Sequence, residues 1–431
     1  MKILNTNQQD FKAQFTPILS RGQADFSLVE KQVKKIISQV RQKKDAALVK
    51  YTRRFDRLPV KSAADLTVQA AEIQAAYSQL TAQQIEAIKL AAERIRNYHL
   101  RQMRQSWFME GEDGIRLGQL IRPLERAGVY VPGGKAAYPS SVLMNVIPAQ
   151  VAGVKEIILC SPVNPNGKLH PAVLAAADIL GVSRIFRIGG AQAVAAMTYG
   201  TETVPRVDKI VGPGNTYVAA AKRLVYGEVG IDMVAGPSEI LVIADESASA
   251  DYVAADLLSQ AEHDELACSI LLTPSVELAQ AVFAKVPQQL RELSRNKIAA
   301  ESIARYGLIV VTRDLDEAAE LADWVAPEHL ELAVKNPQAL LEKIHNAGAI
   351  FLGHYTPEPI GDYLAGPNHV LPTGGSARFS SPLGVDDFIK KSSLISYSAS
   401  AMTRQAATAI QLAEMEGLTA HAAAVRQRLE L

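Results

Sequence analysis

The 431-residue sequence contains only two cysteines, Cys160 and Cys268, and neither belongs to a Cys-x-x-Cys pair. This scarcity excludes a disulfide-rich secreted scaffold and the common zinc-finger arrangements. Each cysteine lies in a short apolar run of the kind found in buried strands. We therefore expect reduced, inert thiols in the protein core.

The chain also lacks an excess of charge, because 45 Lys and Arg residues balance 45 Asp and Glu residues. No overall field therefore favours nucleic acid or an anionic membrane as a partner. The N-terminal segment has no signal-peptide core, and proline, serine and asparagine interrupt the one uncharged window, 136–154. With 48% hydrophobic and 21% charged residues, the composition predicts a globular cytoplasmic protein.

Three common functional motifs are absent. No Gly-x-Gly-x-x-Gly follows a predicted strand, and no His-Glu-x-x-His occurs. Lys135 follows a glycine as in a P-loop, but Ala136 stands where that motif needs Ser or Thr, and Val129 stands at the first glycine position. The sequence thus gives no standard dinucleotide, P-loop or metalloprotease signature.

The hydrophobic pattern predicts an α/β protein. Residues from about 27 to 107 follow a helical period, and short apolar runs alternate with amphipathic segments beyond residue 128. This alternation indicates parallel sheets with helices on both faces, and so many strands fit two doubly wound sheets better than one. The predicted strands are 128–131, 156–160, 184–188, 209–211, 240–244, 269–273, 308–311, 330–334 and 349–352. The clearest helices between them are 171–180, 217–226, 250–261 and 314–324, and a helical tail follows Ser396.

Four glycine-rich turns punctuate this pattern, at 132–134, 189–190, 212–215 and 236–238. In open α/β sheets, glycine allows the backbone to approach a phosphate beyond the carboxyl end of a strand. The turns therefore indicate a nucleotide or a phosphorylated ligand, although strand-to-helix turns use glycine for conformational reasons alone. The turns do not favour a dinucleotide over ATP or a sugar phosphate.

The segment most typical of acid/base chemistry is Ala326-Pro-Glu-His-Leu330. Histidine titrates near neutral pH and glutamate can activate water, so Glu328 and His329 together suit proton transfers. Pro327 fixes its own backbone and biases Ala326 away from a helix, so we predict a stiff loop. A Glu-His pair on a surface loop is also common without any function.

Gln260 and His263 are three residues apart on a predicted helix and share one face, so both can bind one metal ion. Glutamine is an unusual ligand, and a capping or surface histidine explains the same spacing. Further polar candidates lie in the glycine- and proline-rich region 353–384 and in the tail: Asp362, His369, Glu416 and His421. A helix cap for Asp362 and solvated tail positions for Glu416 and His421 are the alternative interpretations.

Taken together and in this order, a set of segments resembles the histidinol dehydrogenases over nearly the whole chain. The matching segments are Arg53-Arg-Phe-Asp56, Val129-Tyr-Val-Pro-Gly-Gly134, Pro139-Ser-Ser-Val-Leu-Met144, Gly189-Gly-Ala-Gln192, Val211-Gly-Pro-Gly-Asn215, Asp232-Met-Val-Ala-Gly-Pro-Ser-Glu239, Ser259-Gln-Ala-Glu-His263, Ala326-Pro-Glu-His-Leu330, Gly361-Asp362 and Gly366-Pro-Asn-His369. One departure is Lys43-Lys44-Asp45, where relatives usually carry a glycine before the aspartate, and it affects only a local turn.

The resemblance implies an α/β fold of two incomplete Rossmann-like, doubly wound domains with small helical extensions at both ends. It divides the chain into an N-terminal extension, a first domain with the zinc and substrate site, a second domain with the NAD site, and a C-terminal dimerisation tail. The corresponding residues are 1–25, then 26–128 with 237–383, then 129–236, and finally 384–431.

The same resemblance implies an oxidoreductase of histidine biosynthesis, an amino-acid biosynthesis pathway. It would oxidise L-histidinol to L-histidine through bound histidinaldehyde, with one zinc ion per subunit and two NAD. Glu328 would activate water and His329 would be the general base. The implied zinc ligands are Gln260, His263, Asp362 and His421. The implied substrate contacts are Ser238, Gln260, His263, His329, Asp362, His369, Glu416 and His421, and the implied NAD contacts are Tyr130, Gln192 and Asn215. The protein would be a homodimer whose tail, with His421, enters the neighbouring active site.

Two other functions are compatible with the residues alone. A metal-dependent hydrolase would use Glu328 to activate metal-bound water and would need no nicotinamide coenzyme. A non-catalytic zinc- and nucleotide-binding module would bind histidinol or NAD and convert neither. Turnover that depends on NAD separates both from the dehydrogenase.

Overall fold

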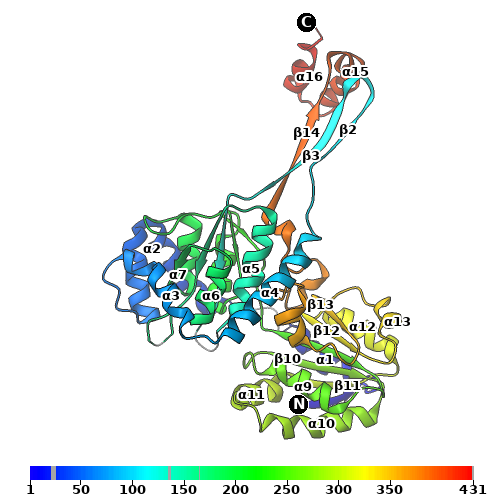
Figure 1. The fold of residues 1–431 in the computed structure, drawn as a ribbon. Helices are drawn as coiled ribbons and strands as arrows, with labels where there is room; N and C mark the ends of the chain where they lie inside the picture. Colours follow the sequence, from blue (N-terminus) through cyan, green and yellow to red (C-terminus); the bar gives the residue numbers. More distant parts are fainter. Residues whose placement is uncertain (21–25, 134–136, 165, 430–431) are drawn as a thin grey trace.

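The computed structural model describes residues 1–20, 26–133, 137–164 and 166–429. It contains two parallel sheets covered by helices and a long arm that projects away from both (Figure 1). Each strand predicted from the sequence is present, with ends within two residues of the prediction. The predicted fold class, a doubly wound α/β protein with two Rossmann-like sheets, is confirmed.

The first sheet has six strands in the order β1-β11-β10-β9-β12-β13, all parallel. Their inner members are apolar runs buried on both faces, as a covered parallel sheet requires. The strands are β1 (Lys2–Asn5), β9 (Glu239–Ala244), β10 (Cys268–Thr273), β11 (Gly307–Val311), β12 (His329–Ala333) and β13 (Ala349–Leu352). Helices α1 (Phe11–Ser20), α12 (Leu315–Val325) and α13 (Pro337–Leu341) cover one face. Helices α9 (Ala250–Ala261), α10 (Val276–Leu290) and α11 (Asn296–Tyr306) cover the other.

The second sheet has five parallel strands in the order β6-β5-β4-β7-β8. The strands are β4 (Arg126–Tyr130), β5 (Glu156–Cys160), β6 (Arg184–Phe186), β7 (Lys209–Val211) and β8 (Gly230–Ile231). Helices α5 (Pro139–Ala152) and α6 (Pro171–Ile179) cover one face, and α7 (Gly190–Tyr199) and α8 (Thr216–Val225) cover the other. Because β1 precedes this sheet and β9 follows it, the second sheet is an insertion into the first.

Helices α2 (Ser27–Tyr51), α3 (Ala70–Tyr77) and α4 (Ala82–Leu100) pack on the second sheet. Helix α2 lies on α7 and α8, α3 lies on α6, and α4 lies on α5. The division implied by the resemblance groups residues 26–128 with the first sheet instead. The apolar faces of these helices join the two hydrophobic clusters that sandwich the five-stranded sheet, and this burial assigns the helices to it.

The arm consists of an antiparallel sheet, ordered β14-β3-β2, and two terminal helices. Its elements are β2 (Trp107–Glu110), β3 (Arg116–Pro123), β14 (Ile389–Ser396), α15 (Ala399–Met415) and α16 (Thr419–Arg426). Figure 1 shows α15 and α16 at the far end of the arm, remote from both parallel sheets. The helical tail is confirmed, whereas the sequence did not predict the arm strands because their side chains are mostly exposed on both faces.

Short helical turns connect these elements. They are η1 (Thr52–Asp56), η2 (Ala63–Leu66), η3 (Glu112–Gly114), α14 (Glu358–Ile360), η4 (Gly361–Ala365), η5 (Ser376–Arg378) and η6 (Val385–Phe388). Both cysteines are buried free thiols as predicted, and burial raises the pKa of Cys160 to about 12. Within the described residues, no helix combines the length and the apolar character needed to cross a bilayer. The cytoplasmic location stays a prediction.

Lys44 interrupts the long helix α2. Its backbone has φ 48° and ψ −128°, a conformation that favours glycine. The Lys44 ammonium donates hydrogen bonds to the carbonyl oxygens of Tyr199 (3.1 Å) and Gly200 (2.8 Å) at the end of α7. The chain therefore keeps the local turn without glycine, and the lysine side chain ties the turn to the neighbouring helix.

Candidate active site

The candidate site lies at the amino ends of strands β9 and β12 of the first sheet. The register pairs His329 with Ile240, which brings Ser238 and Glu239 to the same edge. His329 is the first residue of β12, so the prediction of a stiff loop for both residues of the pair is wrong for His329. A turn does precede β12, since Ala326 ends α12 in the left-handed region with φ 50°.

The His329 ring is 4% exposed and is surrounded by carboxylates. Nδ1 lies 3.0 Å from the Glu239 carbonyl oxygen and 3.0 Å from Gln260 Nε2. Nε2 faces Glu358 Oε1 at 3.8 Å and Asp362 Oδ1 at 3.7 Å, both beyond hydrogen-bonding distance. Burial disfavours the imidazolium, but Glu358, Glu328 and Asp362 together raise the pKa of His329 well above its ordinary value. These carboxylates therefore stabilise a proton on the ring.

Glu328 is a buried carboxyl held in one orientation. Its Oε2 accepts a hydrogen bond from the backbone N–H of Glu239 at 2.9 Å and lies 3.7 Å from His329 Nδ1. Burial raises the pKa of Glu328 to about 8, against the opposing effects of His329 and the Glu239 amide. A carboxyl that titrates near neutral pH is suited to take a proton from water.

A group of potential metal ligands adjoins His329. One ligand atom each from His263, Glu358 and Asp362 lies within 4.8 Å of the others. His263 follows the end of α9, and Asp362 lies in the π-helical turn η4. Burial lowers the pKa of His263, which keeps the imidazole neutral as metal ligation requires. Glu358 is a member of this group that the sequence did not reveal, because no motif marks it.

Several buried polar atoms here lack a hydrogen-bond partner within the described residues: Gln260 Oε1, His329 Nε2, Asp362 Oδ1 and His369 Nε2. Leaving such an atom unsatisfied costs about 1–3 kcal/mol, so their concentration in one place indicates a bound group. The donors are imidazole nitrogens and amide or carboxylate oxygens, a set that fits zinc. Three of the four predicted zinc ligands, Gln260, His263 and Asp362, thus belong to one site.

The site opens into a cleft of about 910 Å³ lined by Asp362 and His369. Its walls come from both halves of the chain, including Tyr98 of α4 and Phe351 of β13. His369 is anchored by its neighbour Asn368, whose amide donates to the Met144 carbonyl at 2.6 Å. The cleft therefore provides room for a small substrate beside Asp362 and His369. Ser238, half-buried at the amino end of β9, lies at the same edge.

Glu416 and His421 are not brought to this site within one chain. Both are exposed on the arm, Glu416 at the end of α15 and His421 in α16. Figure 1 shows these helices far from β9 and β12.

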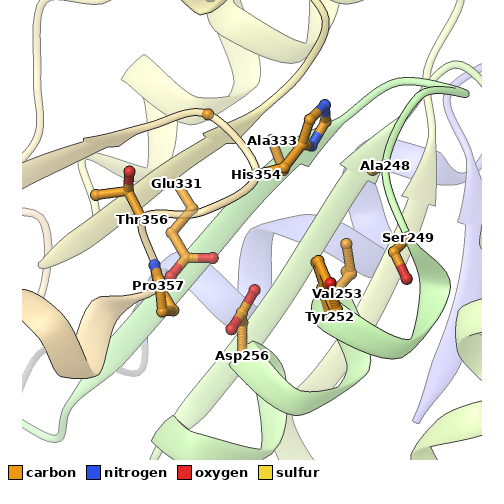
Figure 2. A pocket seen from close by; sticks show the side chains of 11 residues that line it. Ala248, Ser249, Tyr252, Val253, Asp256, Glu331, Ala333, His354, Thr356 and Pro357 are labelled. Atoms are coloured by element: carbon orange, nitrogen blue, oxygen red, sulfur yellow. The ribbon is translucent and has the colours of Figure 1, made fainter.

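A second pair of acids, Asp256 and Glu331, lines a small separate pocket (Figure 2). Glu331 of β12 points toward Asp256 of α9, and its Oε1 accepts a hydrogen bond from the backbone N–H of Glu358 at 2.6 Å. Burial raises the pKa of Asp256 to about 6, and burial with the charge of Asp256 raises the pKa of Glu331 well above its ordinary value. Burial therefore favours a proton on this pair, and Glu331 fixes the backbone that carries Glu358.

A separate pocket of about 400 Å³ lies at the carboxyl ends of strands β4 and β7 in the second sheet. It is lined by all three predicted coenzyme contacts, Tyr130, Gln192 and Asn215. The Tyr130 hydroxyl accepts a hydrogen bond from the Gly190 N–H at 3.0 Å, and Asn215 Oδ1 caps α8. The turn at Gly212 needs glycine, because its φ is 109° and a Cβ there would lie 2.1 Å from the Tyr130 carbonyl oxygen. Gly134 and Lys135 of the first glycine-rich turn lie outside the described residues.

A buried histidine among carboxylates, a second pocket at the carboxyl ends of parallel strands and two Rossmann-like sheets fit a coenzyme-dependent oxidoreductase. Comparison with known proteins gives the family. Residues 19–429 match the family model described as histidinol dehydrogenase. The chain is 56% identical over 430 residues to the histidinol dehydrogenase of Geobacter metallireducens, covering 100% of this chain and 98% of that one. It is 57% identical over 401 residues to that of Halalkalibacterium halodurans, covering 92% and 93%.

A solved structure agrees with the sequence relatives. The crystal structure of histidinol dehydrogenase from Elizabethkingia anophelis has a TM-score of 0.92 and 38% identity, covering 100% of this chain and 98% of that one. The chain therefore belongs to the histidinol dehydrogenase family, and it is an NAD-dependent oxidoreductase.

Proposed function

We propose that this protein oxidises L-histidinol to L-histidine through bound histidinaldehyde, in two hydride transfers to two NAD. This reaction would be the last step of histidine biosynthesis. The observation that carries the proposal is the set of buried, unpartnered polar atoms around His329 in a member of this family. Such a set is suited to bind a polar substrate and to move protons at one place.

The donor set described above supports a metal-dependent mechanism. Gln260, His263 and Asp362, with His421 of the partner subunit, would hold a zinc ion, which supplies a Lewis acid that binds and orients the substrate. Ser238, His369 and Glu416 would contact the substrate beside these ligands.

The protein's own side chains account for the proton transfers. In the first oxidation, His329 Nε2 takes the hydroxyl proton of the alcohol while hydride leaves the carbon for NAD, which gives the aldehyde. Glu328 then takes a proton from water as the water oxygen bonds to the aldehyde carbon, and the His329 imidazolium returns its proton to the former carbonyl oxygen, which gives the hydrate. His329, neutral again, takes a hydroxyl proton of the hydrate as the second hydride leaves the carbon for NAD. Glu358, 3.8 Å from Nε2, stabilises the imidazolium that forms.

The coenzyme pocket of the second sheet would bind NAD through Tyr130, Gln192 and Asn215. Its position at the carboxyl ends of parallel strands is where such sheets bind nucleotides, which supports the assignment. Each hydride transfer would use a separate NAD, so NADH leaves and NAD enters while the aldehyde stays bound.

A homodimer with shared active sites would complete the ligand set. The arm carries Glu416 and His421 and exposes large apolar side chains, among them Ile395 (72% exposed) and Met415 (83% exposed). An exposed apolar surface on a projecting sheet and helix pair is suited to cover a second copy of the chain. The arm would thereby deliver His421 to the cleft of the partner subunit.

Replacing Glu328 by Gln tests the assignment of the two steps. We expect oxidation of histidinaldehyde to slow by roughly 10²–10⁴-fold and oxidation of histidinol to histidinaldehyde to slow much less, because only the aldehyde step adds water. Single-turnover measurements with each substrate give the two rates. The control, Glu331→Gln, removes a buried carboxyl three residues further along the chain, in β12, and should slow both steps alike. Equal slowing of both steps in Glu328→Gln would contradict the role of Glu328.

A further inference from the structure

The segment Arg53-Arg-Phe-Asp56 matches the family pattern but has no role in the mechanism above. In the structure it forms most of the π-helical turn η1, which follows the end of α2. Phe55 and Asp56 both line the pocket of the second sheet, together with Tyr130, Gln192 and Asn215. The segment is thus in place to contact whatever that pocket binds.

Asp56 lies against the start of helix α7. Its carboxylate accepts hydrogen bonds from the Gly189 backbone N–H and, at 3.4 Å, from the Gln192 side-chain amide. The contact is close, because a Cβ on Gly189 would lie 2.7 Å from Asp56 Oδ1. Burial raises the pKa of Asp56 to about 6, and the two hydrogen bonds oppose this effect, so the group is a carboxylate above neutral pH.

This carboxylate occupies a position that Rossmann-like sheets commonly give to a coenzyme phosphate, the N-terminus of a helix that follows a strand. The neighbouring helix α8 is capped by a side chain, because Asn215 Oδ1 accepts from the N–H groups of Tyr217 (3.1 Å) and Val218 (3.2 Å). At the start of α7, Asp56 accepts from the Gly189 N–H, and the Tyr130 hydroxyl accepts from the Gly190 N–H. Asp56 therefore places a negative charge beside the helix end where a coenzyme phosphate would otherwise lie.

In ordinary dinucleotide-binding sheets, an acidic residue at the end of the second strand accepts hydrogen bonds from the ribose 2′-hydroxyl. Here the corresponding strand β5 ends at Cys160 and is followed by Ser161 and Pro162, with no carboxylate. Asp56 lies close to Pro162, since a Cβ on Gly189 would be 2.7 Å from both side chains. Asp56, in the turn η1 that follows α2, thus places a carboxylate near the end of β5, where the strand itself supplies none.

Phe55 adds a flat apolar surface beside this carboxylate. Its ring is 39% exposed and stacks on Tyr51, with ring centroids 5.6 Å apart and an interplanar angle of 6°. The Arg54 guanidinium lies 5.3 Å from the Phe55 ring centroid. An aromatic ring that is held in place by a stacked neighbour yet partly exposed is suited to pack against a planar heterocycle.

We propose that Asp56 determines coenzyme specificity: its carboxylate accepts hydrogen bonds from the adenosine ribose of NAD and excludes a coenzyme that carries a 2′-phosphate. Phe55 packs against the adenine ring of the same coenzyme. This inference rests on the proposed binding of NAD in the pocket of the second sheet. It goes further by naming the part of the coenzyme that the pocket selects and the residue that selects it.

The test compares NAD with NADP in the zinc-loaded, dimeric enzyme carrying Asp56→Asn. Because the amide keeps the shape of the side chain and removes its charge, we expect the ratio of kcat/KM for NAD to kcat/KM for NADP to fall roughly 10- to 100-fold. The KM for histidinol should stay unchanged. The control, Asp45→Asn, removes another half-buried carboxylate that accepts a hydrogen bond from Thr203 outside the pocket, and should leave the ratio unchanged. Phe55→Leu should raise KM for both coenzymes alike.

A readout besides turnover is inhibition by adenosine monophosphates. The wild type should bind 5′-AMP more tightly than 2′-AMP, and Asp56→Asn should reduce that preference by a similar factor. If Asp56→Asn folds poorly, Asp56→Ser gives the same comparison with a smaller neutral side chain. An unchanged NAD-to-NADP ratio in a folded variant would overturn the role of Asp56. If Gln192→Ala and Asn215→Ala also leave NAD binding unchanged, the pocket itself is wrongly assigned and the proposed function fails with it.

Discussion

At the scale of single residues, the proposed chemistry depends on charge that is buried around one imidazole. His329 has Glu358 and Asp362 on one side and Glu328 on the other, all within 4 Å. The carboxyl behind them, Glu331, is close enough to Asp256 to share a proton with it. Buried acids of this kind are costly to ionise, and they make the stability of the protein depend on pH.

The pair Asp256 and Glu331 leads to a prediction about pH. Both acids bind protons more tightly in the folded chain, since burial raises the pKa of Asp256 from 3.8 to about 6 and raises the pKa of Glu331 above 4.5. Their contribution to stability is therefore complete below about pH 4 and is lost as pH rises through the folded-state pKa values. The unfolding free energy of the wild type should fall between pH 5 and pH 8. We expect it to fall less in Glu331→Gln, which has one titrating carboxyl fewer.

Urea denaturation of the wild type and the variant at several pH values measures this effect under one metal condition. Glu320→Gln, at an exposed acid on α12, is the control and should follow the wild-type pH dependence. If the unfolding free energy of Glu331→Gln changed with pH as steeply as that of the wild type, the pair would be ionised in the folded protein.

At the scale of the elements, Lys44 shows how one residue is accommodated in a conformation that suits glycine. A non-glycine residue in the left-handed region carries strain of about 1–3 kcal/mol. The two hydrogen bonds from its ammonium to the end of α7 offset this strain. The balance between these two effects can be measured by substitution.

We expect Lys44→Met to lower the free energy of unfolding by about 1–3 kcal/mol, because it loses both hydrogen bonds and keeps the strain. Lys44→Gly loses the same bonds but relieves the strain, so it should be more stable than Lys44→Met by about 1–2 kcal/mol. At the helical neighbour Lys43 the order should reverse, with glycine less stable than methionine by about 1 kcal/mol. Thermal or urea unfolding of the four variants gives the comparison. Glycine less stable than methionine at both positions would show that Lys44 is not strained.

The elements also show which parts of the fold the sequence could predict. The buried parallel strands were predictable because both faces are apolar, as in the run Glu239–Ala244. The edge strand β1 and the arm strands were not, since exposed strands carry no such pattern and their pairing depends on distant segments. The packing of α2–α4 was also missed, because a helical period shows which face is apolar but not which sheet it covers.

The candidate site was predictable only in part for a similar reason. The spacing of Gln260 and His263 on one predicted helix connected these two residues, but only the family resemblance connected Asp362 to them before the fold brought the three together. Glu358 and Glu331 carry no motif, and Glu331 stands inside an otherwise apolar strand, so burial alone reveals them. The role of Asp56 depends on its contact with Gly189, far away in the chain, which no local pattern can show.

At the scale of the whole molecule, the arm is the feature that a single chain does not explain. It carries Glu416 and His421 away from the cleft and exposes apolar side chains at its surface. A dimer in which each arm enters the other subunit's cleft accounts for both observations.

Mixing two inactive variants tests this arrangement. In a heterodimer of His421→Ala with His263→Ala, one of the two sites would have an intact ligand set. Random subunit exchange should therefore restore about one quarter of the wild-type activity. The control pairs His263→Ala with Asp362→Ala, which both lie in the body of the chain, and should restore none. Absence of rescue in the first mixture, with subunit exchange demonstrated, would place all zinc ligands in one chain.

The most direct test of the whole account is the amount of NADH formed per L-histidinol consumed, before and after metal is removed with a chelator. The account predicts two NADH per histidinol, loss of both on chelation, and recovery with zinc. One NADH per histidinol would mean that the aldehyde is released and that Glu328 does not activate water. Turnover without any NADH in the metal-loaded dimer would contradict the dehydrogenase and favour a metal-dependent hydrolase.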